Sequence, residues 1–134
     1  MIAVDTNLIA YLYVGGKQTP AARAALDKDG EWIAPRLWRS ELRNILARYV
    51  RRGEFTLGEA LDVIDAAEEL LCTGEYEPSS RRVMDLAIQS GCTAYDCEFV
   101  GLALDLGIPL VTSGREILQR FPSVALSPED FTAS

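Results

Sequence analysis

The sequence predicts a single α/β domain in which helices cover both faces of a parallel sheet. MIAV at residues 1–4 and IPLVT at residues 108–112 are short, mostly apolar runs without polar alternation, which is typical of strands buried on both faces. Amphipathic segments with helical spacing lie between such runs, and this alternation favours parallel strands joined by helices. The 134 residues are 49% hydrophobic, enough for one core, and no linker or repeat divides residues 1–134.

The individual elements follow from these patterns and from local boundary signals. Pro20 marks the first turn of the second helix, and Pro35 and Gly53 mark the first position and the cap of the third. The predicted strands are residues 1–4, 32–34, 108–112 and 124–126, with a further short strand in the connector 72–78. The predicted helices are residues 6–14, 19–29, 35–53, 56–71, 79–91, 93–106 and 115–121. The polar tail, residues 127–134, is expected to be loose.

The amino-acid composition argues against several classes of protein function. The net charge of −7 argues against a protein that coats nucleic acid by bulk charge, but not against a nuclease with an acidic metal site. Histidine is absent, which removes the commonest general base and the commonest zinc ligand. The three cysteines show no CxxC spacing, and neither a signal peptide nor a membrane span is recognisable. We therefore expect a reduced, soluble, cytoplasmic protein that does not act at a membrane.

Asp5 stands directly after the first predicted strand, in the run MIAVDTNLIAYL. Ligands of open parallel sheets bind beyond the carboxyl ends of the strands, so Asp5 would point into that crevice. Two interpretations are open. Asp5, Thr6 or Asn7 would cap the following helix, or Asp5 would bind a metal ion.

Two further carboxylates border the expected core. Glu41 lies beside the apolar stripe of its helix, where a carboxylate is costly unless it pairs with an arginine such as Arg48 or binds a metal ion. Asp96 begins a later helix, and its spacing from Thr93 also fits a capping box with Asp in place of Glu. Because Asp5, Glu41 and Asp96 come from three separate elements without histidine or thiolate, their convergence would select Mg²⁺ or Mn²⁺.

Three segments together resemble the PIN domain, in particular the VapC-type toxin ribonucleases of type II toxin–antitoxin systems. They are VDTNLIAYL (residues 4–12), SELRNIL (40–46) and TAYDCEFVGLALDLGIPLVTS (93–113). The resemblance implies an α/β/α sandwich around a parallel sheet of about five strands, and endoribonuclease activity that requires Mg²⁺ or Mn²⁺. It places Asp5, Glu41 and Asp96 at catalytic, metal-binding positions. It also implies an RNA substrate, a cognate antitoxin and a homodimer.

One position departs from the family pattern. The family carries another Asp two residues after the threonine of PLVT, where this chain has Gly114. Neither Glu116, which would begin the next helix, nor Glu98, which is turned away from Asp96, is assigned as a replacement. The missing carboxylate favours a single ion over two. It also supports an alternative function, a weakly catalytic module that binds RNA or an antitoxin.

Other polar residues would support this chemistry. Thr6, Asn7, Asn44 and Thr112 are candidates for holding carboxylates or waters, although each is also explained as a cap or a satisfied polar group. Arg48, Arg52 and Arg115 are candidates for binding substrate phosphates, against the simpler explanation of solvated charges. A phosphotransferase that uses Asp5 as nucleophile is a third possibility. It is disfavoured because no second aspartate follows two residues later.

Overall fold

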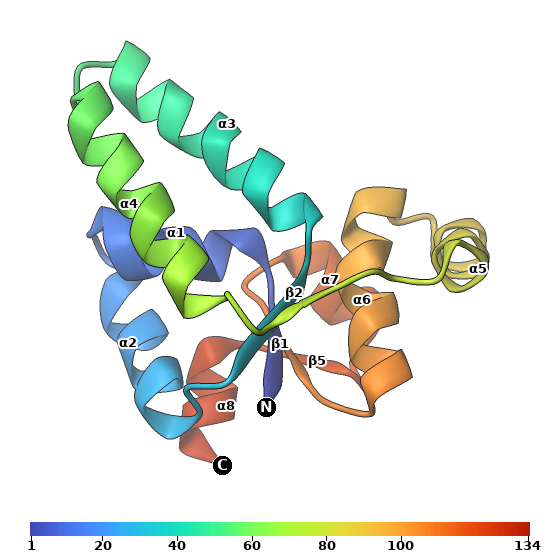
Figure 1. Ribbon diagram of the computed structural model, residues 1–134. Coiled ribbons are helices and arrows are strands. Elements are labelled where there is room, and N and C mark those ends of the chain that lie inside the picture. Colours follow the sequence, from blue (N-terminus) through green and yellow to red (C-terminus); the bar gives the residue numbers. More distant parts are fainter.

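The computed structural model describes residues 1–134 and has the expected α/β architecture (Figure 1). All strand pairs are parallel. The strands are β1 (Ile2–Val4), β2 (Trp32–Pro35), β3 (Glu75–Tyr76), β4 (Leu110–Val111) and β5 (Ala125–Leu126). The helices are α1 (Thr6–Val14), α2 (Thr19–Lys28), α3 (Leu37–Arg51), α4 (Leu57–Leu70), α5 (Ser80–Ser90), α6 (Ala94–Leu106), α7 (Arg115–Arg120) and α8 (Pro128–Ala133). No helix combines the length and the apolar character that a membrane crossing requires.

The order of the strands fixes where a ligand site can form. The five-stranded sheet has the order β3-β2-β1-β4-β5, so the chain adds strands to one side of β1 and then returns to the other side. Ala3 pairs with Ile33 of β2 and with Leu110 of β4, which makes β1 the central strand. Between β1 and β4 the direction of winding reverses. In open parallel sheets this switch point is where ligands bind, beyond the carboxyl ends of the strands.

Helices cover both faces of the sheet, which confirms the three-layer arrangement. Figure 1 shows α1, α2 and α4 on one side of the strands and α5 and α6 on the other. The strand β1 is completely buried, as its apolar sequence requires. Trp32 and Trp38 are among the largest fully buried side chains and anchor β2 and α3 in the core.

Two boundary predictions were wrong. Pro35 does not begin a helix. It ends β2 and pairs in parallel register with Tyr76, and α3 begins only at Leu37. Proline has the same φ in an extended strand end as in a first helical turn, so its presence alone could not decide between them.

The polar tail was expected to be loose, but it forms α8. Ser127 caps this helix through a bond from the backbone N–H of Asp130, and Pro128 occupies its first turn. Phe131 is buried, and Lys28 of α2 lies 4.6 Å from the centre of its ring. The capping pattern Ser-Pro-Glu-Asp was therefore the stronger signal, and a single buried aromatic ring fixes the short helix on α2.

Candidate active site

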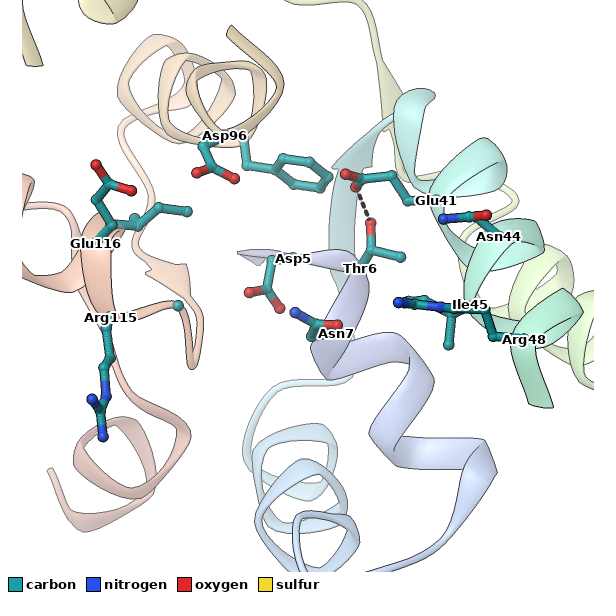
Figure 2. Close-up of a pocket in the computed structure, with 13 residues that line it drawn as sticks. Asp5, Thr6, Asn7, Glu41, Asn44, Ile45, Arg48, Asp96, Arg115 and Glu116 are labelled. Carbon is teal, nitrogen blue, oxygen red and sulfur yellow. Dashed lines mark hydrogen bonds between the residues drawn. The ribbon is translucent and has the colours of Figure 1, made fainter. Parts of the chain in front are cut away.

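A pocket of about 360 Å³ opens at the carboxyl ends of the central strands, where the winding reverses (Figure 2). It brings together Asp5, Glu41 and Asp96, the three carboxylates singled out from the sequence. They come from the end of β1, from α3 and from the first turn of α6. Phe99, Ile45 and Ile117 form its apolar walls. The pocket is therefore assembled from segments far apart in the sequence.

Asp5 caps the helix that follows it, which was one of the two interpretations left open by the sequence, and its binding of a metal ion stays a prediction. Its Oδ1 accepts the backbone N–H of Leu8 at 2.9 Å and so caps α1. Its Oδ2 accepts a hydrogen bond from the hydroxyl of Thr112, which is itself fully buried. Burial raises the pKa of Asp5 to about 6, helped by the charges of Glu41 and Asp96 and opposed by the two hydrogen bonds. Each carboxylate oxygen still has a lone pair free for another partner.

Glu41 has no arginine partner, so the ion pair that would have explained it structurally is absent. Its Oε1 instead accepts a hydrogen bond of 2.6 Å from the hydroxyl of Thr6 (Figure 2). The side chain is half-buried, and burial together with the charge of Asp96 raises its pKa. Glu41 does border the apolar face of α3, whose buried residues are Trp38, Leu42 and Leu46.

Asp96 forms only half of the expected capping box. Its backbone N–H donates to the hydroxyl oxygen of Thr93 at 3.0 Å, but its carboxylate makes no return bond to the Thr93 backbone. That carboxylate points into the pocket beside Glu116 (Figure 2). Burial and then the charge of Glu116 raise its pKa. Glu116 was not assigned from the sequence as a replacement for the missing carboxylate, yet the first turn of α7 brings it to the pocket.

The donor set fits a hard divalent cation. Asp5, Glu41, Asp96 and Glu116 share the pocket, and none of them takes part in an ion pair. Oxygen ligands without sulfur or imidazole suit Mg²⁺ or Mn²⁺. As they stand, however, no three acidic or cysteine side chains lie close enough together to share one ion. An ion bound here would therefore be held by one or two carboxylates together with waters, which is usual for Mg²⁺.

The other predicted site residues differ in whether they hydrogen-bond a carboxylate of the pocket. Thr6 and Thr112 hold Glu41 and Asp5, as described, whereas Asn7 and Asn44 line the pocket without a side-chain hydrogen bond. Gly114 also lies at the pocket, as predicted. Its φ of −69° is open to any residue, so the freedom of glycine is not needed there.

The three candidate arginines occupy different places. Arg48 lines the pocket. Arg115 also lines it, but Figure 2 shows its guanidinium extending away from the carboxylates. Arg52 is not part of this pocket and lines a neighbouring groove instead. Arg39, on the same helix as Arg48, points elsewhere and forms ion pairs with Glu68 and Glu75.

Comparison with known proteins identifies the family. The model of the PIN domain matches residues 2–123, nearly the whole chain. The protein belongs to the PIN domain family. This PIN domain is 29% identical over 126 residues to Ribonuclease VapC3 of Pyrobaculum aerophilum, covering 92% of this chain and 96% of the relative.

A solved structure supports the fold of this PIN domain. The crystal structure of PAE2754 from Pyrobaculum aerophilum superimposes with a TM-score of 0.77 at 23% sequence identity. The match covers 98% of this chain and 93% of the solved one. The PIN-like sandwich expected from the sequence is thereby confirmed.

Proposed function

We propose that this PIN domain is an endoribonuclease dependent on Mg²⁺ or Mn²⁺, and that it is the toxin of a VapBC-type toxin–antitoxin pair. The observation that carries the proposal is the group of four carboxylates without cationic partners in one pocket at the switch point of the sheet. The similarity to a VapC ribonuclease over nearly the whole chain supports the substrate class.

Each residue of the pocket would have a separate role in metal or substrate binding. Asp5 and Asp96 would bind the ion most directly, and Glu41 would bind it or orient a water. When bound, Mg²⁺ or Mn²⁺ would supply a more acidic water and neutralise charge on the phosphate. Thr112 and Thr6 hold the Asp5 and Glu41 carboxylates in place through their hydroxyls. Arg48, at the edge of the pocket, would bind a substrate phosphate.

The direct test is cleavage of single-stranded RNA by the purified protein with Mg²⁺, with Mn²⁺ and with EDTA. We expect cleavage with either ion, none with EDTA, and none for Asp96→Asn. The matched control is Glu98→Gln, on the same helix but outside the pocket lining, which should cut like the parent. Cleavage that persists in EDTA would overturn the proposed metal dependence.

Gly114 favours a second candidate, a PIN module that binds RNA or an antitoxin and cuts poorly. This position lines the pocket but supplies no side-chain oxygen. Parent protein that binds RNA without cutting it, together with a Gly114→Asp variant that cuts, would establish this second function.

Protein partners are part of the proposal. Apolar side chains remain exposed on α4, where Leu57 and Leu61 are 65% and 49% exposed, and on α5, where Met84 and Ile88 are 54% and 78% exposed. Such surfaces suit a second copy of the chain and a cognate antitoxin. The three free cysteines suit a reducing cytoplasm. Light scattering of the purified chain tests the homodimer.

A further inference from the structure

The first turn of α3 lacks the usual side-chain cap. The chain passes from β2 to α3 through Arg36 alone, which has helical backbone angles and makes no side-chain bond to the first turn. The start of a helix leaves free N–H groups and frays unless other contacts hold it. Glu41 is the fifth residue of this helix, so whatever fixes the start of α3 also fixes a carboxylate of the acidic pocket.

Glu75 of β3 anchors this turn from a different part of the chain. Its Oε2 accepts hydrogen bonds from Nε1 of Trp38 at 2.8 Å and from Nε of Arg39 at 2.7 Å. Its Oε1 accepts a third, from Nη2 of Arg39, at 2.9 Å. Two parallel bonds from one arginine give the pair both strength and a defined orientation. The side chain of Glu75 is only 13% exposed, so water competes little for these bonds.

The position of Glu75 is itself closely defined. It pairs with Ala34 in the parallel register of β2 and β3. At Gly74, the preceding residue, an added Cβ would overlap the carbonyl oxygen of Trp32, so only glycine lets the edge strand lie this close to β2. The sheet therefore holds Glu75 on β3 and Asp5 after β1 in a fixed relation to each other.

The contacts of Arg39 and Glu41 hold α3 on two sides. The two residues are two positions apart, so their side chains leave the helix in nearly opposite directions. Arg39 is bound to β3, whereas Glu41 accepts the hydrogen bond from Thr6 of α1 (Figure 2). Rotation of α3 about its axis by about 10° would move a side-chain atom at the helix surface by about 1 Å. Metal coordination tolerates displacements of only a few tenths of an ångström.

We propose that Glu75 is a positioning residue for the acidic pocket: by fixing the rotation of α3, it keeps the Glu41 carboxylate directed toward the other carboxylates. Glu75 does not line the pocket and acts only through Trp38 and Arg39. The proposal rests on the metal-dependent ribonuclease function given above, to which it adds a residue outside the pocket.

The test measures Mn²⁺ affinity by calorimetry rather than cleavage. Glu75→Gln keeps an oxygen that can accept from Trp38 but loses the charge that binds Arg39. The matched control is Glu68→Gln, which removes the same charge from the other, more exposed partner of Arg39, on α4. Both changes are also made in a Glu41→Gln background, which shows whether a loss of affinity passes through Glu41. Circular dichroism establishes that each variant is folded under the conditions of the titration.

We expect Glu75→Gln to weaken Mn²⁺ binding by about three- to tenfold, less than the roughly 10- to 100-fold typical of a direct hydrogen-bond partner of a metal ligand. Glu68→Gln should match the parent. In the Glu41→Gln background, Glu75→Gln should cause less than about a twofold further loss, because the carboxylate that it positions is gone.

Arg39→Lys provides a second variant, which decides the question if Glu75→Gln does not fold. Lysine keeps the positive charge but cannot form two parallel hydrogen bonds with Glu75. We expect a loss of Mn²⁺ affinity in the same direction as for Glu75→Gln, and again little further loss in the Glu41→Gln background.

Four results would overturn the positioning role. A folded Glu75→Gln protein that binds Mn²⁺ like the parent would make Glu75 purely structural, and a Glu41→Gln protein that does so would leave it nothing to position. Equal losses in the parent and Glu41→Gln backgrounds would mean a general loosening of the pocket. An equal loss in Glu68→Gln would mean a long-range effect of charge.

These results are distinguishable from failure of the proposed function. In each of them, a parent that binds Mn²⁺ and cuts RNA leaves the ribonuclease function intact. A parent that binds no Mn²⁺ overturns both proposals.

Discussion

The hydroxyl of Thr112 donates a hydrogen bond to Oδ2 of Asp5, a residue 107 positions earlier in the chain. The same hydroxyl oxygen accepts the backbone N–H of Gly114 at 3.0 Å. One buried side chain therefore fixes both the Asp5 carboxylate and the turn that leads to Glu116. It does so between β1 and β4, the two strands at which the sheet changes its direction of winding.

Thr112→Val should destabilise the protein because it leaves Oδ2 of Asp5 and the backbone N–H of Gly114 without a hydrogen-bond partner. We expect a loss of about 1–3 kcal/mol in the free energy of unfolding, measured by urea denaturation. Thr112→Ser keeps the hydroxyl and should lose less. A larger loss in Thr112→Ser than in Thr112→Val would show that the methyl group, not the hydrogen bond, stabilises the site.

Asp5→Asn should leave the metal-free protein as stable as the parent or more stable, by up to about 2 kcal/mol. Asparagine carries no charge into a buried position whose carboxylate has a pKa raised to about 6, and it relieves the repulsion by Glu41 and Asp96. The measurement is chemical denaturation at pH 8 in EDTA. Addition of Mn²⁺ should stabilise the parent and not the variant, because only binding to the folded state shifts the equilibrium. A variant much less stable than the parent in EDTA would contradict the predicted repulsion.

Gly114→Asp should tighten Mn²⁺ binding and increase RNA cleavage. A Cβ at this position would lie 3.3 Å from Oγ1 of Thr112, so a small adjustment is enough to admit a side chain. The position is also the uncapped start of α7, which Asp or Asn would cap. Gly114→Asn is therefore the matched control for shape and capping. In calorimetric titration, Gly114→Asp should bind Mn²⁺ more tightly than Gly114→Asn. Equal affinities of the two variants would place position 114 outside the metal-binding site.

Glu116→Gln should weaken Mn²⁺ binding, because Glu116 is the fourth carboxylate of the pocket and interacts with Asp96. The control is Glu129→Gln, which removes the same charge from the first turn of α8, outside the pocket lining. We expect the first variant to lose affinity in calorimetry and the second to match the parent. Unchanged binding in Glu116→Gln would leave the pocket with only three working carboxylates.

The pairing of Glu75 with Arg39 should give the stability a recognisable pH dependence. Hydrogen bonds from Arg39 and then from Trp38 lower the pKa of Glu75, whose side chain is 13% exposed, below its usual 4.5. The stabilisation is therefore complete above pH 4.5 and is lost as the pH falls through the lower pKa of the folded state. Glu75→Gln should cost about 1–3 kcal/mol at pH 7 and less at pH 3.

Urea denaturation at the two pH values tests this dependence. Glu68→Gln, which removes the more exposed partner of Arg39, should cost under about 1 kcal/mol at either pH. A cost for Glu75→Gln that does not change with pH would show that shape, not charge, stabilises this contact.

Most of the fold could be predicted from the sequence because its local signals were consistent with one another. The uniform apolar character of residues 1–4 predicted a strand buried on both faces, and β1 is buried throughout. Local signals of the same kind begin α4, where Thr56 and Glu59 form a capping box. The prediction for Pro35 was wrong because its φ fits both a strand end and a first helical turn. Its pairing with β3 places it in the strand. The tail was misjudged because composition was given more weight than the capping pattern that starts at Ser127.

The sequence was enough to predict which residues form the candidate site, but not how their side chains are arranged in space. Asp5, Glu41 and Asp96 were chosen because each stands where an element ends or meets the core, and all three line one pocket. Glu116 was considered but not assigned, because its approach to the pocket depends on the angle of the turn after β4, which a sequence does not specify. The sequence could not distinguish Arg48 from Arg52 as phosphate-binding candidates. In the structure Arg48 lines the acidic pocket, whereas Arg52 lines only the neighbouring groove.

The contributors to the pocket are spread from Asp5 to Ile117, and β4 enters the sheet between strands made early and a strand made late. A growing chain on the ribosome thus carries Asp5 and Glu41 long before Asp96 and Glu116 exist. Parallel pairing across such separations also forms slowly, because a long loop must close first. The pocket therefore forms only once nearly all of the chain has been synthesised and folded, and a shorter nascent fragment lacks part of its group of carboxylates.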